Sequence, residues 1–301
     1  MIVTMYHKAV LLKESVDGLN IKPDGIYVDV TFGAGGHSRE ILNQLGPEGK
    51  LFAFDQDKDA LRNSIDDNRF MLINENFQYI IRFLRFYGVR KVDGILADFG
   101  VSSHQFDKAE RGFSIRFDAD LDMRMNQDGK LSAYQVVNEY EESDLKDVLL
   151  KYGELRQAPA MAREIVNHRL MEPIKTINQL NFVLKKFLNH RKENKVLAQI
   201  FQAIRIEVNQ EIEVLKSFLK QVPDLLNQNG RLSAISYHSL EDRLVKRFIR
   251  NGLFEGEPER DVFGNFEVPL KKVGNLIVPS NEEIKENNRA RSAKLRIAEK
   301  L

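Results

Sequence analysis

Short apolar runs recur through the first hundred residues, separated by segments long enough for helices. The runs are Ile26–Phe32, Leu51–Phe54, Phe70–Ile73 and Val92–Ala97. Strands that are apolar on both faces are typical of parallel sheets covered by helices on two sides. Between them, His37–Leu45 has helical apolar spacing, and a further helix is expected to begin within Ala60–Ile65. The pattern predicts an α/β fold.

The alternation of apolar runs and helix-length segments stops after Asp107, and no convincing strand pattern is found as far as Gln202. Capping boxes, Ser132 with Gln135 and Thr176 with Gln179, precede two of the amphipathic helices that this region predicts. The expected helices cover residues 133–152, 160–170, 180–188 and 196–219.

The strand pattern returns at Gly230–Ser236, and a capping box at Ser239–Asp242 is expected to open a basic helix. Residues 251–292 are expected to form a surface excursion before a last, half-exposed strand at Ala293–Ala298. We therefore expect an α/β domain, residues 1–106 and 203–301, interrupted by a helical insertion at residues 107–202.

Composition narrows the class of protein. The 301 residues include 45 Lys and Arg, 44 Asp and Glu, and no Cys. The absence of Cys excludes disulfide scaffolds, thiolate zinc sites, iron–sulfur clusters and cysteine nucleophiles. No stretch has the length and apolar character of a membrane span, and no secretory signal pattern is found. We expect a soluble cytoplasmic protein.

The glycine cluster Gly33–Gly36 follows the first strand and opens a helix. A dinucleotide fingerprint would need a third glycine where Ser38 stands, which disfavours a dehydrogenase. Asp55, at the end of the second strand, suits a ribose, and Asp29 suits a cationic ligand better than a pyrophosphate. S-Adenosylmethionine has a ribose, a sulfonium and an α-ammonium group. The alternative is a tight strand–helix turn capped by Asp29.

The fourth strand ends in Asp98-Phe-Gly-Val-Ser-Ser103. Ligands of open α/β sheets bind at the carboxyl ends of central strands, so Asp98 is placed to touch both cofactor and substrate. A strand-ending turn is the alternative explanation of this segment.

Eight segments in order along the chain carry a family resemblance: His7–Leu12, Thr31–His37, Asp98–Ser103, Glu110–Ser114, Leu121–Met125, Phe201–Arg205, Ser236–Arg243 and Arg289–Ser292. Through them the chain resembles the bacterial small-subunit (16S) ribosomal RNA cytosine-N4 methyltransferase family. The resemblance implies a class I S-adenosylmethionine-dependent methyltransferase fold interrupted by a helical substrate-recognition domain. Phe99 and His104 depart from the residues usual in the family.

The resemblance also implies a set of cofactor contacts at strand ends and helix starts. The methionine end would lie against Gly35, Gly36 and His37, the ribose against Asp55 and the adenine against Phe77, with Asp98 and Gln105 completing the pocket. No metal site is expected.

The family's substrate would be a cytosine near the decoding site of 16S rRNA, in the small subunit or its assembly intermediate. Without Cys, the covalent route to ring-carbon methylation is closed, whereas an exocyclic amine needs only a hydrogen-bond acceptor and in-line alignment. Asp98 is the candidate catalytic acceptor, and cofactor positioning alone is its alternative role.

Four arginines are candidates for holding RNA. Arg111 and Arg124 come early in the insertion, and Arg289 and Arg291 lie in the tail. Salt bridges to neighbouring aspartates are the alternative for the first two. Two other classes remain open: a methyltransferase of small molecules or proteins, and a non-catalytic RNA-binding assembly factor.

Overall fold

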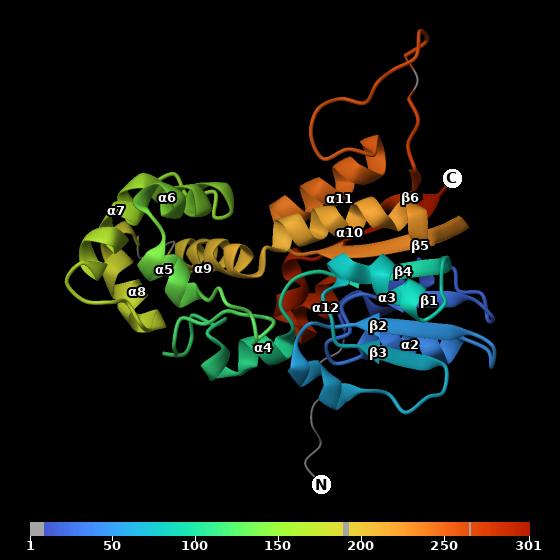
Figure 1. Cartoon of the computed structure of the whole chain (residues 1–301), viewed down its shortest axis with the longest axis horizontal. Helices are drawn as coiled ribbons and strands as arrows, with labels where there is room; N and C mark the ends of the chain where they lie inside the picture. The colour runs from blue at the N-terminus through green and yellow to red at the C-terminus, as the bar shows by residue number, and fades with distance from the viewer. Residues whose placement is uncertain (1–8, 189–192, 265) are drawn as a thin grey trace. The chain divides into compact units, whose positions relative to one another are not determined.

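The computed structural model describes residues 9–188, 193–264 and 266–301 (Figure 1). The first segment of the family resemblance, His7–Leu12, therefore lies partly outside the described residues. Backbone contacts divide the chain into two compact units, one made of Met1–Gly100 with Ile212–Leu301 and the other of Val101–Glu211. The first unit is thus discontinuous in sequence.

The first unit is built on one seven-stranded sheet with the order β3-β2-β1-β4-β5-β7-β6. The strands are β1 (Ile26–Asp29), β2 (Lys50–Phe54), β3 (Phe70–Ile73), β4 (Val92–Asp98), β5 (Leu226–Ser236), β6 (Leu270–Ile277) and β7 (Lys294–Lys300). Strands β1 to β5 pair in parallel, and β7 runs antiparallel to both of its neighbours. A mixed seven-stranded sheet of this kind belongs to the α/β class, and the predicted fold class is confirmed.

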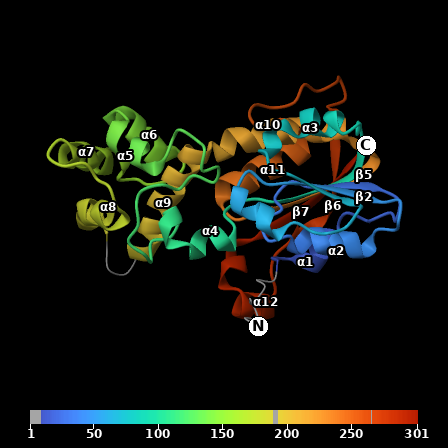
Figure 2. The same ribbon diagram turned by 60° about the horizontal axis from the view of Figure 1, so that its bottom comes forward.

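Helices cover both faces of this sheet, which explains why its central strands are apolar throughout. On one face, α1 (Leu12–Asp17) and α2 (Gly36–Gln44) bury Tyr27 and Leu96. On the other, Val28 and Ile95 pack with three helices: α3 (Ile80–Phe86), α10 (Glu211–Leu225) and α11 (Ser239–Asn251). Figure 2 shows α1 and α2 on the side opposite α3 and α10. Alternate residues of one strand therefore enter two separate cores.

The second unit is helical around its own apolar core. Its helices are α4 (Ser103–Asp107), α5 (Ala133–Glu139), α6 (Glu142–Lys151), α7 (Ala158–Arg169), α8 (Ile177–Leu184) and α9 (Glu193–Asn209). Both predicted capping boxes are present, at the starts of α5 and α8. Its described part holds no strand, only an isolated bridge between Asp120 and Thr176.

The boundaries expected from the sequence differ from this division. The expected domain boundary after residue 202 falls inside α9. The backbone contacts instead place the boundary after Glu211, and α9 has already ended at Asn209. Gln210 has a left-handed backbone with φ 50°, and this residue separates α9 from α10. The single helix predicted over residues 196–219 was therefore wrong.

Other predicted helices also need correction. The helix predicted over 133–152 is two helices, because the backbone is extended at Tyr140 (φ −67°, ψ 144°). Arg169 donates to the carbonyls of Val137 (2.8 Å) and Tyr140 (2.5 Å) at this break. The segment expected to begin a helix at Ala60–Ile65 is a short 3₁₀ turn, Lys58–Asn63. The capping box of α11 uses His238 with Glu241 instead of Ser239 with Asp242.

The expected surface excursion contains β6, the short helix α12 (Asn281–Glu286) and a 3₁₀ turn (Asn288–Ser292). Strand β6 is an edge strand with mostly exposed residues, so its sequence lacks the apolar signal of the central strands. Within the described part of the chain, no helix is both long and apolar enough to cross a membrane.

Candidate functional site

Three aspartates stand at the tips of three adjacent strands. Asp29 ends β1, Asp55 directly follows β2, and Asp98 ends β4. These strands lie side by side in the order β2-β1-β4 and are parallel, so their carboxyl ends meet at one edge of the sheet. This edge is where ligands of open α/β sheets bind.

A glycine turn joins β1 to α2 beside these carboxylates. Gly33 N–H donates a hydrogen bond of 2.8 Å to Asp55 Oδ2. Gly35 has a φ of 76°, and a Cβ atom there would lie 2.8 Å from the ring of Phe32. A Cβ on Gly36 would lie 2.9 Å from that of Ala9. The turn therefore requires glycine, and it presents backbone at the start of α2.

The side chain of Asp29 stabilises this turn through local hydrogen bonds. It is fully buried, and it accepts hydrogen bonds from Ser38 Oγ (2.7 Å) and the Thr31 amide (3.1 Å). Both oxygens are thus engaged locally, as the alternative explanation of this motif expects.

Asp98 is held by residues that sequence reasoning did not assign. Tyr237 Oη donates to Asp98 Oδ1 at 2.8 Å, and the Asp98 amide donates to Thr31 Oγ1 at 2.6 Å. Tyr237 directly follows β5, which pairs with β4. The Ser236–Arg243 segment at the neighbouring strand tip was the signal that could have identified this partner.

The three carboxyl groups share one electrostatic property. Burial raises the pKa of Asp29, Asp55 and Asp98 from 3.8 to about 6, although their hydrogen bonds act in the opposite direction. The charge of Asp29 further raises the pKa of the other two. Within the described chain, none of the three forms an ion pair with Lys or Arg. The site therefore suits a positively charged ligand.

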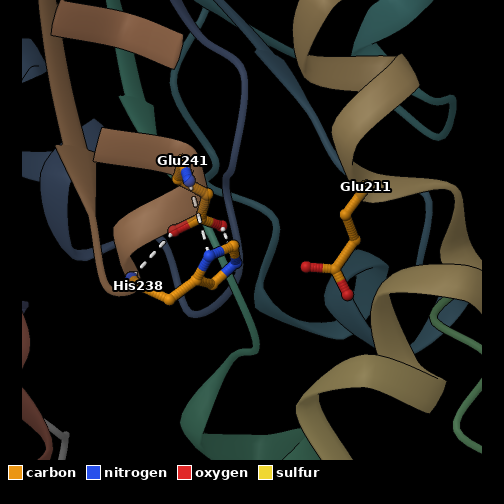
Figure 3. A group of neighbouring side chains, drawn as sticks. All are labelled: Glu211, His238 and Glu241. Carbon is orange, nitrogen blue, oxygen red and sulfur yellow. Dashed lines mark hydrogen bonds and ion pairs between the residues drawn. The ribbon is translucent and has the colours of Figure 1, made fainter. Parts of the chain in front are cut away.

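Both histidines near the site have structural partners. His37 is buried and its Nε2 donates to the Val10 carbonyl at 3.1 Å, while its charge lowers the pKa of Asp98. His238 caps α11, with Nε2 3.1 Å from Glu241 Oε1 (Figure 3). Glu241 also accepts the Tyr237 amide at 2.9 Å. Glu211, drawn in the same figure, belongs to the second unit and pairs with Arg205 there.

Phe77, the residue expected against the adenine, lies in an aromatic cluster. Its ring centroid is 5.3 Å from that of Phe218 and 6.1 Å from that of Phe99, which follows Asp98. Phe77 is half-buried, so one part of the ring packs in the core and another part stays accessible. Its adenine contact stays a prediction.

Gln105, Arg111 and Arg124 belong to the second unit and serve internal contacts there. Gln105 closes the capping box of α4. Arg111 is 5% exposed and donates to the carbonyls of Arg124 (2.9 Å) and Met125 (3.2 Å). Arg124 makes a two-pronged ion pair with Asp122, at 2.8 and 2.9 Å. This pairing is the alternative that the sequence left open for Arg124.

Arg289 and Arg291 lie in the first unit, in the 3₁₀ turn Asn288–Ser292 before β7. Arg291 is exposed and Arg289 is half-buried. Their contact with RNA stays a prediction.

Comparisons with known proteins place these features in a family. The model of the MraW methylase family matches residues 4–301. The chain is 70% identical over 301 residues to ribosomal RNA small subunit methyltransferase H of Christiangramia forsetii, covering 100% of both chains. The proteins of that name from Flavobacterium johnsoniae and Bacteroides fragilis are 69% and 53% identical, over 98% and 99% of this chain and 98% of each relative.

A solved rRNA methylase of Streptococcus thermophilus is a more distant match. It is 13% identical with a TM-score of 0.43, covering 96% of this chain and 95% of that one. This similarity is too distant to support an inference about function.

Proposed function

Because the chain belongs to the MraW methylase family, whose methyl donor is S-adenosylmethionine, we propose that it methylates small-subunit ribosomal RNA at the exocyclic N4 of a cytosine near the decoding site. The observation that carries the proposal is the group of three carboxylates at adjacent strand tips beside a glycine turn, of which Asp29 is buried and Asp55 and Asp98 are half-buried.

The residues present fit the donor. Its sulfonium and α-ammonium groups bring positive charge to a place where three carboxylates have no ion-pair partner among the described residues. Asp55 uses one lone pair on each oxygen for the amides of Gly33 and Asp57, which leaves acceptor capacity for ribose hydroxyls. The turn at Gly35 and Gly36 would hold the methionine end with His37, and Phe77 the adenine.

The bound donor supplies an electrophilic methyl group, and the chain's own residues supply alignment. The cytosine amine has its lone pair delocalised into the ring, so an acceptor must orient its N–H groups. Asp98 would do this through the oxygen that Tyr237 leaves available, since the tyrosine hydroxyl occupies Oδ1. The amine proton would pass to Asp98 or to water. No covalent intermediate is needed, and the chain has no Cys to form one.

The substrate is proposed to be 16S rRNA within the small subunit or its assembly intermediate, in the cytoplasm. The names of the relatives, ribosomal RNA small subunit methyltransferase H, support this assignment. Arg289 and Arg291 are proposed to contact the RNA backbone. Gln105 is proposed to complete the donor pocket, and the helical unit to recognise the substrate.

The test is methyl transfer to small subunits purified from cells that lack this protein. The subunits are incubated with the enzyme and isotope-labelled S-adenosylmethionine, and the rRNA is digested to nucleosides for mass spectrometry. Labelled N4-methylcytidine at one position is the expected product. Label at another atom or in protein would contradict the assignment, and tight binding without turnover would indicate an assembly factor.

A further inference from the structure

The surface of α3 and the turn after it combines exposed cations with exposed aromatic rings. Residues 76–92 contain four basic side chains and no acidic one, in a chain whose basic and acidic residues number 45 and 44. All seven residues of this α3 surface are exposed: Tyr79, Arg82, Arg85, Phe86, Tyr87, Arg90 and Lys91.

Helical spacing puts this chemistry on one face. Tyr79, Arg82 and Phe86 are three and four residues apart, so they line the outer face, while Ile80 and Leu84 are fully buried against the sheet. Phe86 is 80% exposed, and its ring lies 5.2 Å from that of Tyr87 in a T-shaped arrangement. Figure 2 shows α3 on the same side of the sheet as α10.

The arginines on this surface are not used in contacts within the described part of the protein. Arg82, Arg85 and Arg90 make no ion pair and no side-chain hydrogen bond with any residue of the described ranges. Within the same ranges, the Lys91 ammonium group donates to the Leu226 carbonyl alone, at 3.4 Å. In contrast, Arg69, in the same unit, is paired to Asp67 at 2.6 Å.

A merely solvated helix face is a poor explanation of this composition. Solvated faces usually mix charges of both signs and expose few large aromatic rings. Guanidinium groups that have no acidic neighbour attract phosphates, and exposed aromatic rings stack on unpaired bases.

We propose that the α3 surface is a second RNA-binding site, which takes a single-stranded segment of the substrate RNA through arginine–phosphate contacts and base stacking on Phe86. This inference rests on the proposed function for the identity of the RNA. The donor-site residues are not part of this surface.

The experiment measures binding of protein-free, fluorescently labelled 16S rRNA as a function of salt concentration. The double variant Arg82→Glu/Arg85→Glu removes two cations that have no internal partner. If both contact single-stranded phosphates, the slope of log affinity against log salt falls by about 1.4 or more. Phe86→Ala is expected to weaken binding roughly five-fold or more with little change of slope.

Lys13→Glu is the matched control, because Lys13 is exposed on α1, which packs on the opposite face of the sheet. It is expected to leave both affinity and slope close to wild type. Melting temperatures verify that all variants are folded.

The outcomes separate this inference from the proposed function. If wild type neither binds protein-free 16S rRNA nor methylates the rRNA of small subunits, the proposed function fails. If wild type binds and methylates the RNA, and the double variant binds it with unchanged affinity and salt slope, the proposal of a second RNA-binding site is wrong. If the double variant loses affinity for assembled subunits alone, the surface contacts a ribosomal protein, and the RNA assignment is wrong.

Discussion

The charged groups of the strand-tip site and those of the helical unit are buried in opposite ways. Asp55 and Asp98 lose water without gaining a Lys or Arg partner among the described residues, and their pKa rises to about 6. Arg111 and Arg124 also lose water, but carbonyls and Asp122 surround them. A desolvated charge without a partner is costly in a folded protein unless a ligand supplies one, whereas a charge surrounded by hydrogen-bond acceptors or a counter-ion can stay there without a ligand. We therefore propose that the aspartates bind the ligand, whereas these two arginines stabilise the fold.

The largest effect is expected for Asp98→Asn. The neutral amide keeps an acceptor for Tyr237 but cannot take a proton from the amine, so turnover should fall roughly 100-fold or more. Labelled methyl transfer at saturating donor measures it. Asp66→Asn, the same substitution at an exposed residue, is the control. Normal turnover of Asp98→Asn would remove Asp98 from the mechanism.

Arg111→Met is expected to destabilise the protein. It leaves the buried carbonyls of Arg124 and Met125 without their charged donor, which should lower the free energy of unfolding by about 2 kcal/mol. Arg124→Met breaks a half-exposed pair and should cost about 0–1 kcal/mol. Urea unfolding measures both. A stable Arg111→Met protein with impaired RNA binding would reverse the structural assignment.

Asp55→Ala is expected to weaken binding of S-adenosylhomocysteine about ten-fold, through loss of the ribose acceptor and of the bond that holds Gly33. Asp55→Asn keeps an acceptor and should give a smaller loss. Isothermal titration calorimetry gives both affinities. Equal affinity in wild type and Asp55→Ala would place the ribose elsewhere.

Donor affinity is expected to depend on pH around 6. The carboxyl groups are protonated in the free protein below a pKa of about 6, and a cationic donor binds their charged form. Affinity should therefore be level above pH 7 and fall about ten-fold by pH 5 if one group dominates.

The free energy of unfolding of the ligand-free protein should depend on pH in the opposite direction to donor affinity, increasing as pH falls. The folded-state pKa lies above the unfolded value of 3.8, so these groups favour folding increasingly as pH falls from 7 towards 4. Carboxyl groups with lowered pKa, such as Asp67 at about 2, titrate below this window. Melting temperatures with and without donor measure the effect, and parallel pH profiles for the two states would contradict it.

Tyr237→Phe should have the smallest effect. Loss of the hydroxyl removes a hydrogen bond that favours the Asp98 anion, so the acid limb of the pH–rate profile should move up by about one unit. Turnover should recover at higher pH. A uniform loss at every pH would show that Tyr237 contributes in another way.

The sequence predicts well that the three aspartates lie at neighbouring strand tips, because parallel apolar strands bring their carboxyl ends to one edge of the sheet for any conformation of the loops. It does not predict Tyr237 as a partner of Asp98, since that contact depends on β5 pairing beside β4 after a long separation in sequence. It also misses β6, whose residues are mostly exposed.

The sequence also does not predict that Arg111 is buried. Its acceptors lie in a loop where Met123 has a φ of 60°, and the side chain of Asn209, from the distant end of α9, holds that loop through the Met125 amide at 2.7 Å. Tertiary contacts of this kind leave no local pattern. An arginine next to a glycine looks the same in sequence whether it faces solvent or a core.

The most direct test of the account is a crystal structure with S-adenosylhomocysteine bound. Density for the ligand is expected along the glycine turn, with the ribose hydroxyls at Asp55 and the sulfur facing the Asp98 end of the site. Density at any other place, in crystals of a protein that binds the ligand in solution, would contradict the assignment of these carboxylates to the methyl donor.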